Sequence, residues 1–134
     1  MTFQARHINP ADGPAPTGYT HAVELGPGRL LFISGQLPLD DQRALVGPGD
    51  MAAQATQALR NISRVLEAAG ATWANVAKLT IFVMELRAMP ALRDVRAAFF
   101  AEQGVEPPAI TTVGVVGLSV PGALIEIEAY AVVP

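Results

Sequence analysis

Short apolar runs separated by glycine and proline predict strands in the first third of the chain. Residues 21–25 and 29–34 flank the turn-forming residues 26–28 (Gly-Pro-Gly), so we expect the two segments to form a hairpin. Residues 30–33 are apolar on both faces, a pattern typical of a buried strand rather than one at the edge of a sheet. Residues 1–18 are rich in Pro, Gly and Ala and are expected to form an irregular arm.

Two later stretches have apolar residues at spacings of three and four, the period of an amphipathic helix. The first begins after Asp50, a suitable N-cap, and ends at Gly70. Its apolar stripe consists of Ala55, Leu59, Ile62, Leu66 and Ala69. The second helix is predicted from Pro90 to Gly104. Its stripe consists of Leu92, Val95, Phe99 and Phe100.

The remaining segments alternate or are rich in β-branched residues, and they predict three more strands. Residues 76–84 place Leu79, Ile81 and Val83 on one face. Strands are also expected at 109–118 and 124–133, with a turn between them. Residues 107–125 carry no charge, but their prolines and glycines would break a helix, so we expect no membrane span.

These elements predict a single α+β domain, residues 1–134, with two helices packed on one face of a mixed sheet. Two helices can cover only one face of such a sheet. The strand residues that can face away from the helices include Phe82, Met84, Val116 and Tyr130. An apolar surface of that extent usually marks an interface, so we expect the chain to associate with copies of itself.

Composition and charge narrow the possible partners. Only 16% of the residues are charged, against about a quarter in typical soluble domains, which also favours self-association. The formal net charge of −3 provides no basic surface for a phosphate backbone, so no nucleic-acid partner is expected. The chain has no cysteine and its N-terminus does not resemble a secretory signal. Its predicted location is therefore the cytoplasm.

Few residues form a motif with a specific chemistry, and none calls for a cofactor. His7 and His21 belong to no ligand motif, so no metal site is expected, and His21 is expected to bond to the backbone. Ser34 lacks the sequence frame of a nucleophile elbow. Glu126 and Glu128 lie on the same face of one predicted strand, where they can share protons and position water or simply form a solvated surface.

Several short segments match a known family in their order and spacing. They are residues 18–22 (Gly-Tyr-Thr-His-Ala), 32–38 (Phe-Ile-Ser-Gly-Gln-Leu-Pro), 53–55 (Ala-Gln-Ala), 67–70 (Glu-Ala-Ala-Gly), 99–100 (Phe-Phe), 108–109 (Pro-Ala) and 125–129 (Ile-Glu-Ile-Glu-Ala). With these segments the chain resembles the RidA (YjgF) family of reactive-intermediate deaminases over nearly its full length.

The resemblance implies a chorismate-mutase-like fold, in which a mixed sheet is backed by two helices. It also implies a homotrimer with small-molecule sites in the clefts between subunits, and the hydrolysis of an imine or enamine to a keto acid and ammonia. Carried over by position, the implied catalytic residues are Glu126 and Tyr19. The implied substrate-binding residues are Ser34, Gly35, Ile110 and Thr112.

The chain departs from the family at one important position. The family has an arginine after Pro-Ala that holds the substrate carboxylate, whereas this chain has Ile110. The change removes charge-assisted hydrogen bonds worth about 1.5 to 3 kcal/mol each. Arg93 or Arg96 could supply the charge from the second helix, but we expect both to face solvent.

Three functions therefore stay open. The first is a variant deaminase whose substrate is neutral or differently anchored. The second is a trimer that binds a small molecule without catalysis. The third is RNA cleavage, which is known in some members of the family and which the acidic net charge of this chain disfavours.

Overall fold

The computed structural model describes all 134 residues, which form six strands and two α-helices. In chain order these are β1 (Gln4–Ile8), β2 (Ala22–Gly26), β3 (Arg29–Gln36), α1 (Met51–Ala68), β4 (Val76–Val83), α2 (Met89–Gln103), β5 (Ala109–Gly114) and β6 (Ile125–Val133). Two short 3-10 turns, Trp73–Asn75 and Leu86–Ala88, precede β4 and α2. Neither α-helix is both long enough and apolar enough to span a membrane.

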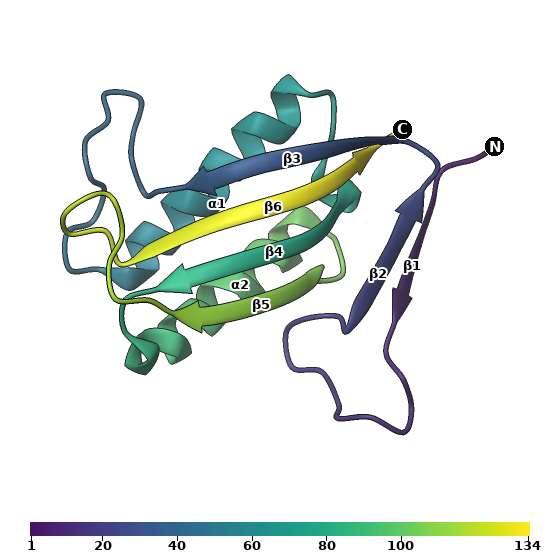
Figure 1. Cartoon of the computed structure of the whole chain (residues 1–134), viewed down its shortest axis with the longest axis horizontal. Coiled ribbons are helices and arrows are strands. Elements are labelled where there is room, and N and C mark those ends of the chain that lie inside the picture. The colour runs from purple at the N-terminus through teal and green to yellow at the C-terminus, as the bar shows by residue number, and fades with distance from the viewer.

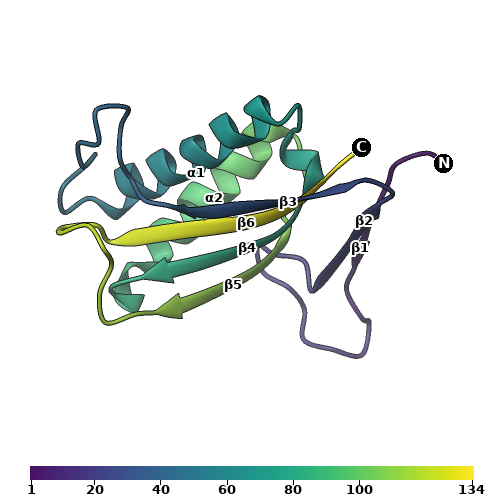
Figure 2. The same ribbon diagram turned by 45° about the horizontal axis from the view of Figure 1, so that its top comes forward.

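The main sheet has four strands in the order β3-β6-β4-β5. Strand β6 is antiparallel to both of its neighbours, whereas β4 and β5 are parallel. Helices α1 and α2 lie side by side on one face of this sheet (Figures 1 and 2). The predicted α+β architecture, a mixed sheet with two helices on one face, is confirmed.

Both helices begin and end close to their predicted limits. The Asp50 side chain accepts a hydrogen bond from the backbone N–H of Ala53 at 3.1 Å, as expected of an N-cap. Helix α1 stops before Gly70, and α2 stops at Gly104. Each of these glycines has a φ near +70°, in the left-handed region where a side chain is unfavourable.

The N-terminal region differs from its prediction. Strand β2 pairs with β1 in an antiparallel ribbon, with Gln4 opposite Gly26, and not with β3 in a hairpin. Strand β1 lies within the segment expected to be irregular. Residues 26–28 turn the chain, but they leave the ribbon standing apart from the main sheet (Figure 1). Strand β5 is also shorter than predicted, because it ends at Gly114.

The core lies between the helices and the sheet. The sheet contributes alternate residues of β4 and β6, and the helices contribute the apolar stripes predicted from their spacing. The largest fully buried aliphatic side chains are Leu59, Ile62, Leu66, Leu79, Ile81, Leu92, Ile125 and Ile127. Burying such a side chain contributes about 1.5 to 3 kcal/mol, so this layer holds both helices against the two central strands, β4 and β6.

The other face of the sheet has no helix over it, and we call it the open face. Leu30 and Phe32 on β3 are 71% and 70% exposed, and β3 is an edge strand of the sheet, so the prediction of a buried strand away from the edge is wrong. Tyr130 lies opposite Phe32 and packs edge-on against its ring, with centroids 5.6 Å apart. Phe82 also belongs to this face, because it lies opposite Glu126. Apolar surface of this kind is typical of an interface.

Candidate functional site

The carboxylate of Glu126 lies on the open face next to a break in the β3–β6 ladder. The register shifts between Ile33 and Gln36, so Ser34 and Gly35 form an irregularity in β3. A Cβ atom on Gly35 would lie 2.7 Å from Cδ of Glu126, which is too close for any real side chain. Glycine at position 35 therefore allows the carboxylate to rest against the β3 backbone.

Glu126 is half-buried and makes no hydrogen bond or ion pair within the chain. Its neighbour on the same face, Glu128, accepts a hydrogen bond from the Tyr130 hydroxyl at 3.3 Å. The two carboxylates, which the alternating pattern of the strand could not tell apart, therefore differ in the structure. Only that of Glu126 has both oxygens available for a water molecule or a proton donor.

Tyr19, Ile110 and Thr112 lie elsewhere, around a cavity of about 180 Å³. Ile110 pairs with Leu79 and Thr112 with Ile81, so both point to the helix side of β5. The remaining lining residues are Thr17 from the N-terminal arm and Met89, Arg93 and Arg96 from α2. We call this the arm cavity.

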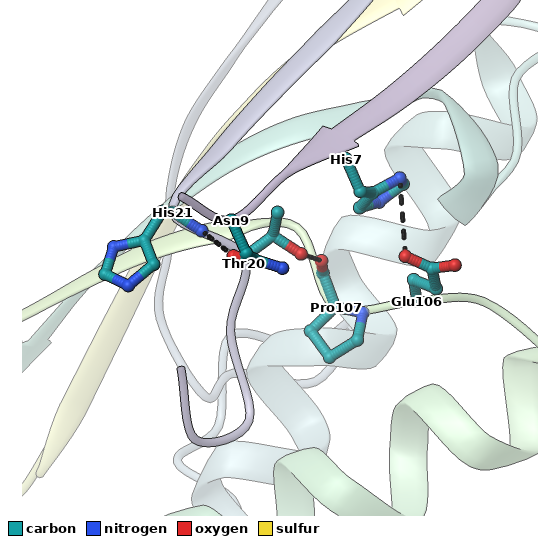
Figure 3. A network of polar contacts seen from close by, with 6 residues as sticks. All are labelled: His7, Asn9, Thr20, His21, Glu106 and Pro107. Carbon is teal, nitrogen blue, oxygen red and sulfur yellow. Dashed lines mark hydrogen bonds and ion pairs between the residues drawn. The ribbon is translucent and has the colours of Figure 1, made fainter. Parts of the chain in front are cut away.

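The arm is attached to the beginning of β5 through Thr20 (Figure 3). The Thr20 backbone N–H donates to the Pro108 carbonyl at 3.0 Å, and its hydroxyl donates to the Pro107 carbonyl at 2.6 Å. Thr20 also forms a parallel bridge with Ala109. These bonds hold the adjacent Tyr19 over the arm cavity.

Both histidines are tied to protein groups in the same region (Figure 3). His21 Nε2 lies 2.7 Å from the Pro14 carbonyl oxygen, which confirms the predicted bond to the backbone. His7 Nδ1 lies 3.6 Å from a carboxylate oxygen of Glu106. No three His, Cys, Asp or Glu side chains of the chain converge as metal ligands would.

Arg96 is buried, contrary to the expectation that it faces solvent. Its side chain is 6% exposed and lines the arm cavity. Arg93 is exposed, as expected, but it lines the same cavity. Burial lowers the pKa of Arg96 below the usual arginine value, and the nearby charge of Arg93 lowers it further. Its position four residues after Leu92 and three before Phe99 is the sequence signal that places it on the buried stripe of α2.

Within one chain the predicted site residues thus form two groups on opposite faces of the sheet. Ser34, Gly35 and Glu126 belong to the region of the β3 irregularity, whereas Tyr19, Ile110 and Thr112 belong to the arm cavity. The largest hollow, about 740 Å³, lies beside the β1–β2 ribbon and includes none of these residues.

Residues 11–133 match the family model described as Endoribonuclease L-PSP. The chain belongs to the RidA (YjgF) family. It is 36% identical to the 2-iminobutanoate/2-iminopropanoate deaminase of Escherichia coli, over 96% of this chain and 98% of the relative. The predicted family membership is confirmed.

Two solved structures match nearly the whole chain. A Rid-family protein of unknown function from Yersinia pestis, YyfB, superposes with a TM-score of 0.88 at 39% identity, over 96% of this chain and 98% of that one. Escherichia coli TdcF with bound serine superposes with a TM-score of 0.74 at 31% identity, over 92% and 91% of the two chains. The RidA fold is therefore the framework that carries both groups of residues.

Proposed function

We propose that this RidA-family protein hydrolyses a small imine or enamine and releases ammonia, with a substrate that differs from that of relatives having an arginine at position 110. The observation that carries the proposal is the carboxylate of Glu126, half-buried against Gly35 and without a protein partner. The 36% identity to a 2-iminobutanoate/2-iminopropanoate deaminase supports the same reaction class.

The proposed chemistry needs one base and one water molecule. Glu126 accepts a proton from water as the water oxygen bonds to the imine carbon and the C=N electrons move to nitrogen. The protonated carboxyl returns this proton to nitrogen, which gives a carbinolamine. Glu126 then takes the hydroxyl proton of the carbinolamine and passes it to nitrogen, the C–N bond breaks, and ammonia leaves as the C=O bond forms. The balance is one imine plus one water giving one carbonyl compound plus one ammonia. An enamine enters the sequence after tautomerising to the imine, and the Tyr19 hydroxyl is the proposed second proton carrier.

We also propose that the protein is a homotrimer whose clefts combine the two groups of site residues. A second copy on the open face would cover Leu30, Phe32 and Tyr130, the large apolar side chains that β3 and β6 expose. Glu126 lies on that face, so a neighbouring copy could place its own Tyr19 near it. The cytoplasmic location stays a prediction from the sequence.

The test is ammonia release from a panel of imines and enamines, with and without a carboxylate, measured against the uncatalysed rate. Removing a general base typically costs about 100-fold to 10,000-fold in rate, so Glu126→Gln should lose at least about 100-fold in kcat. Glu128→Gln is the matched control, because it lies two residues away on the same face. Equal rates for wild type and Glu126→Gln would show that Glu126 is not the base.

A binding protein without catalysis is the second candidate, and Ile110 favours it. This residue places an aliphatic wall where the family has its substrate-binding arginine. Native mass spectrometry of the purified protein distinguishes the two candidates, because a sequestering protein should retain its ligand while it shows no ammonia release. RNA cleavage receives no support from the structure, because the net charge is −3 and both histidines contact protein groups.

A further inference from the structure

A hollow of about 440 Å³ lies at the free edge of β3, the first strand of the main sheet (Figure 1), and we call it the edge pocket. Helix α1 forms one of its walls, so the pocket lies on the helix side of β3, whereas Glu126 lies on the open face. Gly35 borders both of them. Asn61 on α1 fixes the walls, because its amide donates to the carbonyl oxygens of Leu37 and Leu39 at 3.0 and 2.9 Å. Ligand binding therefore needs little rearrangement.

Arg43 lies in the turn between Leu39 and Leu45 and has an unfavourable backbone conformation. Its φ is 60°, and no other residue of the chain except glycine has a positive φ. The backbone N–H of Arg43 donates to the Asp40 carbonyl, and that of Asp40 donates to the Ala44 carbonyl, both at 3.0 Å. Such a turn favours glycine at its left-handed position. The turn itself does not require an arginine, but the side chain of Arg43 lines the edge pocket.

Arg64 on α1 brings a second guanidinium to the pocket. Neither arginine belongs to an ion pair of the chain, and Arg64 donates only a long hydrogen bond of 3.4 Å to Asn61 Oδ1. Asp40 is the one carboxylate in the lining. Its Oδ1 atom accepts the backbone N–H groups of Gln42 and Ala44, each at 2.9 Å, and therefore serves the turn. The donors of both guanidinium groups stay available for an anion.

The charge and the size of the edge pocket favour a phosphate ester. A phosphate monoester carries a charge of about −1.5 to −2 at neutral pH and has three strong acceptor oxygens, so it can engage two guanidinium groups at once. The pocket volume of about 440 Å³ corresponds to roughly fifteen water molecules at roughly 30 Å³ each. It falls in the range of small-molecule sites, about 300 to 1,000 Å³. Inorganic phosphate would leave most of this space empty.

The rest of the lining suits a molecule with hydroxyl groups. The second carboxylate oxygen of Asp40 and the side-chain carbonyl of Gln36 make no hydrogen bond within the chain, so each can accept one from a hydroxyl. Leu37, Leu39 and Val65 provide apolar surface, which suits the C–H groups of a sugar or polyol.

We infer that the edge pocket binds the phosphate monoester of a small sugar or polyol, with the phosphate held between Arg43 and Arg64. The hydroxyl groups of the ligand bond to Asp40 and Gln36. The inference goes beyond the proposed function, because the pocket needs neither turnover nor a second copy of the chain.

The experiment is a calorimetric titration of the full chain with α-D-glucose 1-phosphate at neutral pH and constant ionic strength. Inorganic phosphate and glucose are the reference probes, because each carries one half of the ligand. We expect saturable binding of the ester by the wild-type protein. Inorganic phosphate should bind more weakly, and glucose should show no measurable binding.

Arg43→Gly separates binding from folding. Glycine is the residue that the left-handed backbone favours, so the thermal midpoint should stay the same or rise. The affinity for the ester should nevertheless fall at least about tenfold, because charge-assisted hydrogen bonds are lost, and Arg64→Met should cause a similar loss. Arg60→Met is the control, because Arg60 is exposed one turn before Arg64 on α1 and does not line the pocket. It should bind the ester like wild type.

The inference would be overturned by an absence of saturable binding of the ester, or by equal affinities in wild type, Arg43→Gly and Arg64→Met. An equal loss in Arg60→Met would also overturn it, because the effect would then reflect net charge and not the pocket. Inorganic phosphate that binds as tightly as the ester would overturn the sugar or polyol assignment.

These readouts do not depend on catalysis. A failed titration would leave the role proposed for Glu126 untouched, and an absence of ammonia release would leave the edge pocket untouched.

Discussion

On β3, Ile33 points toward the helices and is 5% exposed, whereas its neighbour Phe32 points to the open face and is 70% exposed. Charged groups show the same contrast, because Arg96 is buried on the helix side of the sheet while Glu126 is half-buried on the open face. The helix side is desolvated by the fold of a single chain. The open face can be desolvated only by another molecule. The properties of Arg96 are therefore set within one chain, and those of Glu126 depend on whether anything covers the open face.

The largest expected effect tests the helix side of this comparison. Ile33→Ala removes a buried side chain from the core cluster, and a truncation of this kind costs about 2 to 5 kcal/mol of unfolding free energy. Chemical denaturation monitored by circular dichroism measures the change. A loss of less than about 0.5 kcal/mol would mean that the helix side of β3 is not packed as described.

The second effect tests the contact between β3 and Glu126. Gly35 is not among the glycines with positive φ, so its backbone accepts alanine and only the collision with the Glu126 carboxylate opposes the change. We expect Gly35→Ala to displace the Glu126 carboxylate, which is the flexible end of its side chain, at a cost of at most about 1 kcal/mol of stability. It should also lower the rate of ammonia release, because Glu126 must move.

Ser34→Ala is the matched control for Gly35→Ala. Ser34 is its neighbour in the same irregularity of β3, but its side chain is exposed, so we expect a change within about 0.5 kcal/mol. Thermal and chemical denaturation of both variants separate the effects of the two positions on stability. A Gly35→Ala protein with wild-type stability and activity would remove the argument that Gly35 positions Glu126.

Most of the fold could be predicted from apolar spacing, because burial against the sheet imposes that spacing on both helices and on β4. The pairing of β2 could not. A short strand has two edges that can accept a partner, and residues 26–28 indicate a turn without fixing which edge is used. The pattern of β3 was also misleading, because a run of four apolar residues does not distinguish a buried strand from an edge strand with one exposed apolar face.

The candidate site was harder to predict than the fold. The sequence placed Glu126 and Glu128 on one face, but the difference between them arises from Gly35 and the register shift in β3, which no local pattern shows. Arg96 was expected to face solvent because arginine usually does. Its place on the apolar stripe of α2 outweighs that preference, since the helix cannot bury Leu92 and Phe99 without turning Arg96 inward as well.

The last prediction tests the open face with Phe32→Ala. We expect this variant to show the smallest change in stability and, in addition, a change in oligomeric state. Phe32 packs mainly against Tyr130 and is otherwise exposed, so Phe32→Ala should alter the stability of an isolated chain by only about 0.5 kcal/mol.

If the open face is the interface of a trimer, the same substitution removes a large apolar contact between copies. Sedimentation equilibrium should then show a trimer for wild type and a concentration-dependent mixture with lighter species for the variant. A wild-type protein of 14.0 kDa at every concentration would refute the assembly. The apolar open face would then need a different partner.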